Sequence, residues 1–500
     1  MEPGQRSYLL PLLTLSVLYL FGMPLWALIA ITIWYLSLLW LEDEGILDKY
    51  GISRMLGVVL MVRTKQGQGV LEKVSSTRKF WRGFGEFSIW LCLLIMIGVV
   101  VLLFASAIET AMSPPEEYLP ASDLLLIPGV TSFVPFWWPV LALIFALVIH
   151  EYSHGIQARA HGMRVRSFGL LLAGPIPIGA FAEPQHHEMV RAPLRERMRL
   201  YAAGPSINII ATYLALLLLS AAATGMVASH SGVYATGIIA DEGADEGGLM
   251  PYEIIIRIDG VRISDYSEFS EQMALLSAGD EVTLTKLSHP NSDGLRTVRD
   301  ISVTLGDRHD YYIDRCEGDL VCIEDTESFL DYLGIEQGDA FLGVSGLRNT
   351  SSTVDMYSSI VSSDRGLLEI TRMTAPLPLG MIGVPIVYDG QTMILEEREM
   401  MRAGDGVVPD LLGTEGMLLL FDFLFWMVWI NFLLGFANLI PMIPFDGGHI
   451  VKDGVHSVLS RLAKGANPLR IESIAGRISS MSSFVILFIV MMPIILPRLI

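Results

Sequence analysis

Long apolar stretches, separated by charged segments, recur along the whole chain. The first covers Ser7–Trp40, is longer than the about 20 residues of one membrane-spanning helix, and is interrupted at Pro24. A cleaved signal peptide has a shorter apolar core, a basic start and a small-residue cleavage site, so this stretch predicts a transmembrane helical hairpin. With this hairpin, about seven spans are predicted, the others at Phe87–Ile108, Pro135–Ile149, Leu200–Ala228, Met417–Ala437 and Phe484–Leu496.

The segments between these runs differ in charge. Lysine and arginine gather in segments 41–85, 159–199 and 447–480, whereas segment 109–129 has acidic residues and no basic one. Segment 229–416 holds 34 acidic against 12 basic residues. Because basic loops stay in the cytoplasm, we expect the three basic segments inside and the two acidic ones outside. This alternation agrees with the number of spans between the segments.

The runs and loops divide the chain into six parts. The predicted parts are an N-terminal transmembrane hairpin (1–45), a basic cytoplasmic loop (46–85), a first transmembrane core (86–228), an acidic extracytoplasmic domain (229–309), an extension or second small domain (310–416) and a second transmembrane core (417–500).

The acidic extracytoplasmic part has the pattern of a water-soluble domain. Residues 253–264 and 280–288 combine apolar alternation with β-branched residues, which predicts strands. Between them, DYSEFSEQMALLSAGD predicts a helix, with Ser264 or Asp265 as its cap and Gly279 just beyond its end.

Composition narrows the class of protein. The chain is 52% hydrophobic and only 17% charged, a balance that would leave a soluble protein with large exposed apolar patches. A formal net charge of −19 argues against a nucleic-acid partner, which requires basic surface. The three cysteines are too few for a disulfide scaffold. Cys316 and Cys322 fall on the predicted oxidising side, where a local disulfide and two free thiols both stay open.

The apolar run LALIFALVI leads directly into HEYSH at 150–154. Ionisable residues in a membrane span are costly and mark functional sites. Residues four apart share a helix face, so His150 and His154 would direct two imidazoles to one metal ion, with Glu151 as general base. The alternative, a pair of core or surface histidines, fits poorly at the end of an apolar helix. His161, two turns on, is predicted to be a boundary residue rather than a further ligand.

Catalytic zinc usually has three protein ligands, so one more is needed. The candidate is Asp446, in GFANLIPMIPFDGGHIV at 435–451. Two prolines interrupt the helix before it, and two glycines after it permit close backbone approach. Irregular backbone at membrane depth is tolerated where it lines a cavity. Asp446 could alternatively be a helix cap at a membrane boundary, and His449 could support it from behind.

Together these two segments resemble the site-2 protease family of intramembrane zinc metalloproteases. That family combines a His-Glu-x-x-His helix with a later Asn-x-x-Pro-x-x-Pro-x-Asp-Gly segment, which here begins at Asn438. The sequence departs at Phe445, where the family usually has leucine, an apolar-for-apolar change. The resemblance implies that Glu151 is the catalytic acid/base and that Zn²⁺ is bound by His150, His154 and Asp446.

Further segments resemble the same family. GPIPIGAFAEP at 174–184 resembles its re-entrant β-hairpin, whose edge could hold an extended substrate by strand addition at Gly179, Ala180 and Phe181. AAGPSINII at 202–210 resembles its Ala-Gly-Pro-x-x-Asn signature, in which Gly204 would allow close helix contact. Asn208 and Asn438 are candidates to hydrogen-bond the substrate or oxyanion.

Residues 232–306 resemble the start of a PDZ domain, a module that many site-2 proteases carry outside the cytoplasm. The implied fold is an α-helical polytopic membrane bundle with a re-entrant β-hairpin and an extracytoplasmic PDZ-like α+β domain. The implied function is regulated intramembrane proteolysis. Single-span membrane proteins, trimmed first by a site-1-type protease, would be cut within the lipid bilayer toward the cytoplasmic side.

Three other functions stay open. The chain could be a non-catalytic PDZ-bearing membrane adaptor with a structural zinc. It could be a different membrane metalloprotease with its third ligand elsewhere. It could also be a cation transporter, but transporters often show internal repeats and paired broken helices, whereas this chain has one broken helix and no repeat.

Overall fold

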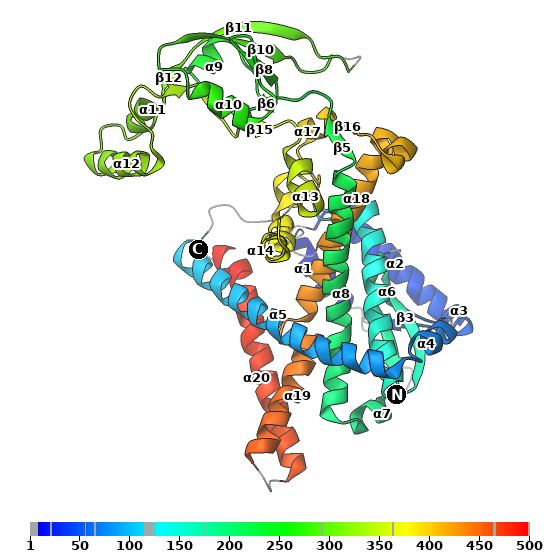
Figure 1. The fold of residues 1–500 in the computed structure, drawn as a ribbon. Helices are drawn as coiled ribbons and strands as arrows, with labels where there is room; N and C mark the ends of the chain where they lie inside the picture. Colours follow the sequence, from blue (N-terminus) through cyan, green and yellow to red (C-terminus); the bar gives the residue numbers. More distant parts are fainter. Residues whose placement is uncertain are drawn as a thin grey trace. The chain divides into compact units, whose positions relative to one another are not determined.

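The computed structural model describes residues 9–20, 23–55, 57–64, 67–114, 123, 126–174, 176–291, 294–362, 365–463 and 467–498, with the backbone alone at 176–184. The chain forms two compact units, which we describe separately (Figure 1). Residues 1–218, 367–392 and 422–500 belong to the first unit, and residues 219–366 and 393–421 to the second.

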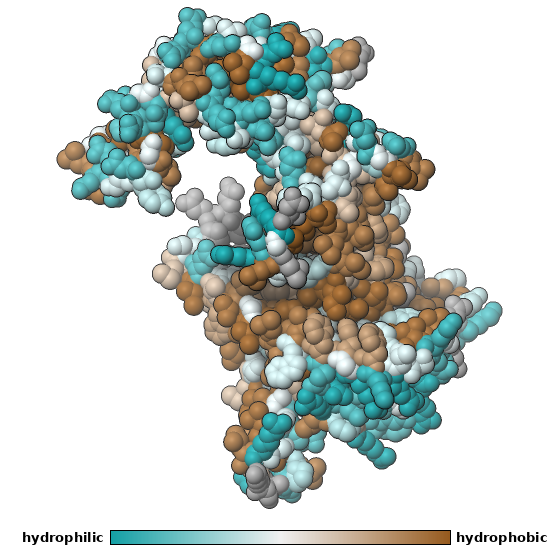
Figure 2. All heavy atoms as spheres, viewed as in Figure 1, coloured by the Kyte–Doolittle hydropathy of each residue, from teal (hydrophilic) through white to brown (hydrophobic). Residues whose placement is uncertain are grey.

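Long apolar helices dominate the first unit. Among the described residues, seven helical segments are long and apolar enough to cross a membrane, which fits the predicted polytopic helical protein. They are α2 (Leu25–Asp43), α5 (Arg78–Met112), α6 (Trp137–Ala160), α8 (Leu194–Ala223), residues 368–387, α18 (Val407–Asn438) and α20 (Pro468–Ile495). Hydrophobic side chains gather over the middle of these helices, and hydrophilic ones around the sheet end of this unit (Figure 2).

The set of candidate spans differs from the prediction at two places. The first helix of the expected hairpin, α1 (Leu9–Leu20), has only 12 described residues and is not among the seven. Residues 368–387, expected in the extracytoplasmic part, take its place. They consist of α14 (Leu367–Thr374), α15 (Leu377–Gly380), a 3₁₀ turn (Met381–Gly383) and α16 (Val384–Val387). Three prolines divide this segment, so its sequence lacks the continuous pattern of a span.

A four-stranded antiparallel sheet lies in the first unit, with strands in the order β1-β2-β3-β4. β3 (Val165–Ala173) and β4 (Ile176–Pro184) form a β-hairpin, in which Gly179, Ala180 and Phe181 pair with Leu171, Leu170 and Gly169; its re-entrant position in a membrane stays a prediction. β1 (Ile52–Met55) and β2 (Val59–Thr64) come from the segment predicted to be a basic loop, and β2 pairs with β3. β4 is left as an edge strand among the described residues, and it packs along α6.

The part of the first unit that carries the HEYSH motif and Asp446 is built from α5, α6, α8 and α19 (Asp446–Leu462). Side chains of α5, α8 and α19 share one apolar core, which includes Cys92, Ala202 and Ile450. α6 runs unbroken through HEYSH, so the span predicted at Pro135–Ile149 continues through the motif.

The second unit contains a six-stranded antiparallel sheet. Its strands are β6 (Val233–Tyr234), β8 (Ile254–Ile258), β9 (Val261–Arg262), β10 (Glu281–Leu287), β11 (Val298–Thr304) and β15 (Arg348–Asn349). The predicted strands and helix are present: Asp265 caps α10 (Tyr266–Met273), accepting from the Glu268 N–H. Phe269 of α10 packs in the core of the sheet with Ile255, Val282 and Val303.

The predicted boundary after residue 309 does not separate two sheets. β15 pairs with β6, and β14 (Val344–Ser345) pairs with β7 (Gly237–Ile238), so residues 344–349 extend the preceding domain. Two helices, α11 (Arg308–Asp314) and α12 (Leu320–Leu333), precede β14 in the chain. A disulfide joins Cys316 to Cys322. Of the two alternatives for these cysteines, the structure therefore has the local disulfide.

Candidate metal centre

His150 and His154 lie one turn apart on α6 and face the same point. Both side chains are buried, and their ring centroids are 4.8 Å apart. Their separation follows from the helix, because residues four apart lie on the same face.

Each ring is fixed by a hydrogen bond at its other nitrogen. Nδ1 of His154 lies 2.7 Å from the carbonyl oxygen of Leu200, and Nδ1 of His150 lies 3.0 Å from Oδ1 of Asn208. Both oxygens only accept, so each Nδ1 donates and each neutral ring keeps a lone pair at Nε2. The two lone pairs are the ones available to a metal ion.

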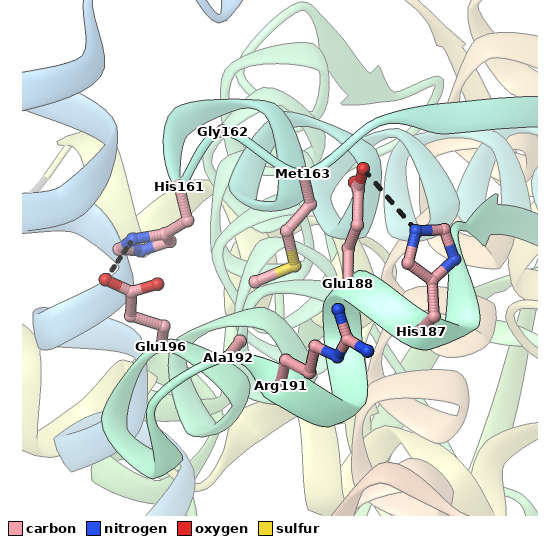
Figure 3. Close-up of a pocket in the computed structure, with 8 residues that line it drawn as sticks. All are labelled: His161, Gly162, Met163, His187, Glu188, Arg191, Ala192 and Glu196. Atoms are coloured by element: carbon pink, nitrogen blue, oxygen red, sulfur yellow. Dashed lines mark ion pairs between the residues drawn. The ribbon is translucent and has the colours of Figure 1, made fainter.

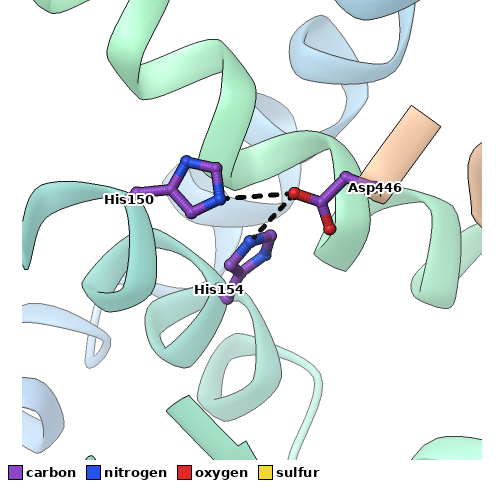
Figure 4. Close-up of side chains that lie close together, drawn as sticks. All are labelled: His150, His154 and Asp446. Carbon is purple, nitrogen blue, oxygen red and sulfur yellow. Dashed lines mark ion pairs between the residues drawn. The ribbon is translucent and has the colours of Figure 1, made fainter. Parts of the chain in front are cut away.

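Asp446 approaches both Nε2 atoms from a different helix (Figure 4). Its Oδ2 lies 3.3 Å from Nε2 of His150 and 3.4 Å from Nε2 of His154. α18 ends at Asn438 and α19 begins at Asp446, so the carboxylate stands at the start of a helix after the predicted interruption. A Cβ at Gly447 or Gly448 would lie within 2.8 Å of the backbone at 439–443, which explains the two glycines.

The spacing between the carboxylate and each of the two imidazoles fits zinc. Tetrahedral zinc with bonds of about 2.0–2.2 Å places neighbouring donor atoms about 3.3–3.5 Å apart. Both nitrogen–oxygen distances match that spacing, and the three donor atoms all lie within 4.8 Å of one another. Two imidazoles and one carboxylate are also a ligand set of catalytic zinc sites, which keep the fourth position open.

Gly204 of α8 leaves the space beside these donors. A Cβ at this position would lie 2.3 Å from Nε2 of His154 and 2.6 Å from Nε2 of His150. Any other residue would therefore press its Cβ against both Nε2 atoms. The close helix contact predicted from the AAGPSINII segment is made here, between α8 and the two ligands of α6.

The comparison with known families decides the classification. The model of Peptidase family M50 matches residues 138–486, which include all three candidate ligands. The chain belongs to peptidase family M50. The resemblance to site-2 proteases is thereby confirmed.

Relatives of this M50 protein come from bacteria and archaea. It is 27% identical to an uncharacterized protein of Methanocaldococcus jannaschii over 47% of this chain and 61% of that protein. It is 24% identical to a protein of Xylella fastidiosa named "Putative zinc metalloprotease", over 47% of this chain and 61% of that protein. The alignments thus span about three fifths of the length of these relatives.

The remaining predicted site residues of the M50 chain have different surroundings. Glu151 is half-buried on α6, between the two histidines in sequence. Asn208 is fully buried behind His150, and its Nδ2 donates to Ala146 O at 3.3 Å and to Asn431 Oδ1 at 3.4 Å. Asn438 donates to Leu434 O of its own helix at 2.9 Å. These contacts favour positioning roles, and the oxyanion roles of both asparagines stay predictions.

Sequence reasoning missed several residues that support the centre. Asn431 of α18 is buried and bonds to Asn208. Arg197 of α8 forms a two-pronged pair with Asp453 of α19, at 2.9 and 2.6 Å. Tyr201 was also missed; its ring stacks on that of His449, the residue that the sequence had suggested as a support for Asp446, with centroids 4.8 Å apart. The available signal was Asp453, an ionisable residue two helical turns after Asp446. Its partner Arg197 lies 256 positions away in sequence, so the pair could not be predicted.

A separate pocket of about 420 Å³ lies beyond the end of α6 (Figure 3). His161 lines it with a buried ring, and Nδ1 lies 3.5 Å from Oε1 of Glu196. On the other side of the pocket, the backbone N–H and the guanidinium of Arg164 donate to Glu188 and lower its pKa. His161 is not one of the three clustered metal donors.

Proposed function

We propose that this M50 protein is a zinc endopeptidase that hydrolyses peptide bonds in or near transmembrane segments of membrane-anchored proteins. The observation that carries the proposal is the His150–His154–Asp446 cluster, which is assembled among helices apolar enough to cross a membrane. A transmembrane helix pairs all its backbone groups internally, so a substrate must unwind before a peptide bond is exposed. A polar, metal-binding pocket at this depth supplies the place for that chemistry.

Each residue of the centre has its own role in the proposed hydrolysis. Zinc, when bound, supplies a Lewis acid that polarises a carbonyl and activates water. Glu151 takes and returns the proton as general base and acid. Asn208 and the Leu200 carbonyl hold the two imidazoles in the tautomer that binds metal. Gly204 keeps the space beside the Nε2 atoms clear.

The β3–β4 hairpin supports a binding mode for the substrate. β2 occupies the outer edge of β3, whereas β4 is an edge strand that packs along α6, the helix of Glu151. An unwound substrate could add to β4 as a further antiparallel strand along residues 179–181. We propose that this hairpin is the re-entrant element that presents the scissile segment to the centre.

The second unit supports a regulatory part in the proposal. Its antiparallel sheet and α10 agree with a PDZ-like domain at 229–309, which would bind the trimmed tail of a single-span substrate after a site-1-type cut. The Cys316–Cys322 disulfide agrees with an oxidising, extracytoplasmic location for this domain. The basic segments would then face the cytoplasm, on the side from which water reaches the centre.

Metal analysis and cleavage assays test the proposal together. Detergent-purified wild type should hold about one zinc per chain, and Asp446→Ala should lose most of it, since a three-ligand site is left with two. Glu151→Gln should keep its zinc and lose cleavage of a single-span membrane substrate. A Glu151→Gln protein that still cleaves would overturn the catalytic role. Zinc retained fully in Asp446→Ala would move the third ligand elsewhere, and zinc binding without any cleavage by wild type would favour the adaptor.

A further inference from the structure

Residues 367–392 form an apolar excursion between two parts of the second unit. The chain leaves the second unit after residue 366 and rejoins it at residue 393, while the residues between belong to the first unit with the long helices. From Met373 to Tyr388 the excursion has no charged residue. Several of its apolar side chains are exposed: Leu379 (41%), Ile386 (41%) and Val387 (73%).

Two hydrogen bonds attach the excursion to neighbouring helices. The Tyr213 hydroxyl of α8 donates to Ala375 O at 2.9 Å, and the Trp429 indole N–H of α18 donates to Ile382 O at 3.3 Å. Each of these carbonyls lies three residues before a proline, so the residue that would pair with it in a 3₁₀ turn has no N–H to donate. The side chains of α8 and α18 supply hydrogen bonds to both carbonyls within this proline-interrupted segment. Irregular backbone is tolerated at membrane depth only with such internal partners.

We propose that residues 367–392 are a re-entrant membrane segment, which enters the lipid layer and leaves on the same side. The exposed apolar side chains of this segment would contact lipid acyl chains. The uncharged run continues the lipid-facing surface of α8, where Leu214, Leu217 and Leu218 beside Tyr213 are about half exposed. This interpretation makes residues 368–387 a partial insertion, although their length and composition would also suit a full crossing.

The base of the excursion is closed, which excludes a single crossing. Thr353 precedes the excursion in sequence, and Glu397 follows it. The N–H and the hydroxyl of Thr353 donate to the carboxylate of Glu397 at 2.6 and 2.9 Å. A chain that crossed within 368–387 would have to cross back before α17 (Leu395–Met400). The seven residues 388–394 reach about 25 Å when fully extended, less than the about 30 Å of a hydrocarbon core.

The first test determines the side of each flank. Cys92 is buried and the other two cysteines form a disulfide, so a thiol reagent reaches mainly introduced cysteines. Gly366→Cys and Gln391→Cys are placed at exposed positions in the full-length protein, and a Cβ at Gly366 meets nothing within 4 Å. In sealed vesicles, a membrane-impermeant maleimide should label both from the same face. Labelling from opposite faces would show a full crossing and overturn the proposal.

The second test measures whether residues 379 and 387 lie in the lipid hydrocarbon. Nitroxide labels at Leu379→Cys and Val387→Cys should be more accessible to oxygen than to a water-soluble nickel chelate, as for a label at Leu94→Cys, 70% exposed on α5. A label at Leu275→Cys, 79% exposed in the second unit, serves as the aqueous control. Labels at 379 and 387 that behave like the one at 275 would place the excursion in water. Neither measurement requires zinc or catalysis, so its failure is distinct from failure of the proposed protease function.

Discussion

Nδ1 of His150 lies 3.0 Å from Oδ1 of Asn208, and the same amide donates to Ala146 and Asn431. This chain of hydrogen bonds joins the candidate ligand His150 on α6 to α8 and α18. It fixes the tautomer of the ring and the direction of Nε2. The metal site is thus supported by three helices before Asp446 completes it.

Asn208→Ala should weaken zinc binding by about 10–100-fold while the protein stays folded, because loss of a group that orients a ligand has this effect. Asn208→Asp, which keeps an acceptor for His150 Nδ1, should bind zinc more tightly than Asn208→Ala. Competition with a chromogenic chelator measures both affinities. Equal zinc affinity in wild type and Asn208→Ala would show that the hydrogen bond does not support the metal.

Gly204→Ala should weaken metal binding by at least about tenfold, the lower end expected for a disturbed ligand shell. Its Cβ would lie 2.3 Å from His154 Nε2, so the ring would have to move. Gly98→Ala on α5 is the matched control, since its Cβ meets nothing within 4 Å and alanine favours helix. Zinc content and thermal unfolding should separate the two variants. If Gly204→Ala keeps normal zinc, the space beside the histidines is larger than the structure shows.

Asp453→Ala should destabilise the protein by about 3–5 kcal/mol if the Arg197 charge is left without its partner in a buried site. The full effect requires burial of both groups; Asp453 has a side-chain exposure of 6% and Arg197 of 18%, so the lower end is expected. Zinc binding should weaken too, because the pair holds α19 and hence Asp446 against α8. Arg195→Ala, which removes a 62% exposed partner of Glu86, should cost about 0–1 kcal/mol. Similar unfolding midpoints for the two variants would contradict the proposed role of the Arg197–Asp453 pair in holding α19 against α8.

Glu397 should make the stability of the second unit depend on pH. Burial raises the pKa of Glu397, although Thr353 and Tyr234 donate to its carboxylate. A raised pKa in the folded state means that folding favours the protonated form. Its contribution to stability is therefore full below the unfolded pKa of about 4.5 and is lost as pH rises through the folded pKa.

Glu397→Gln tests this dependence, since the amide is uncharged and the hydroxyls of Thr353 and Tyr234 can also accept. Thermal unfolding of the full-length protein at a series of pH values above 4.5 should show wild type losing stability relative to Glu397→Gln. A constant difference between the two proteins across this range would show that Glu397 does not titrate within it.

Local patterns in the sequence determined much of this protein. Periodicity and capping identified the long helices, the β8–β10 strands and α10, because each depends on neighbouring residues. Of the two caps that the sequence offered for α10, Ser264 and Asp265, the structure has Asp265. The spacing of HEYSH placed two histidines on one face, and the Pro- and Gly-rich segment pointed to Asp446. Short-range geometry and ligand chemistry were sufficient for these predictions.

Tertiary structure alone decided which distant residues support those elements. Asn431 reaches Asn208 across 223 positions, and Arg197 reaches Asp453 across 256. The strands at 52–64 joined the β3–β4 hairpin, and residues 367–392 joined the long helices. The charge pattern had placed the first segment in a basic cytoplasmic loop and the second in the acidic extracytoplasmic part. These pairings depend on which backbone and side-chain groups remain unpaired after folding, and the linear sequence does not state where their partners will lie.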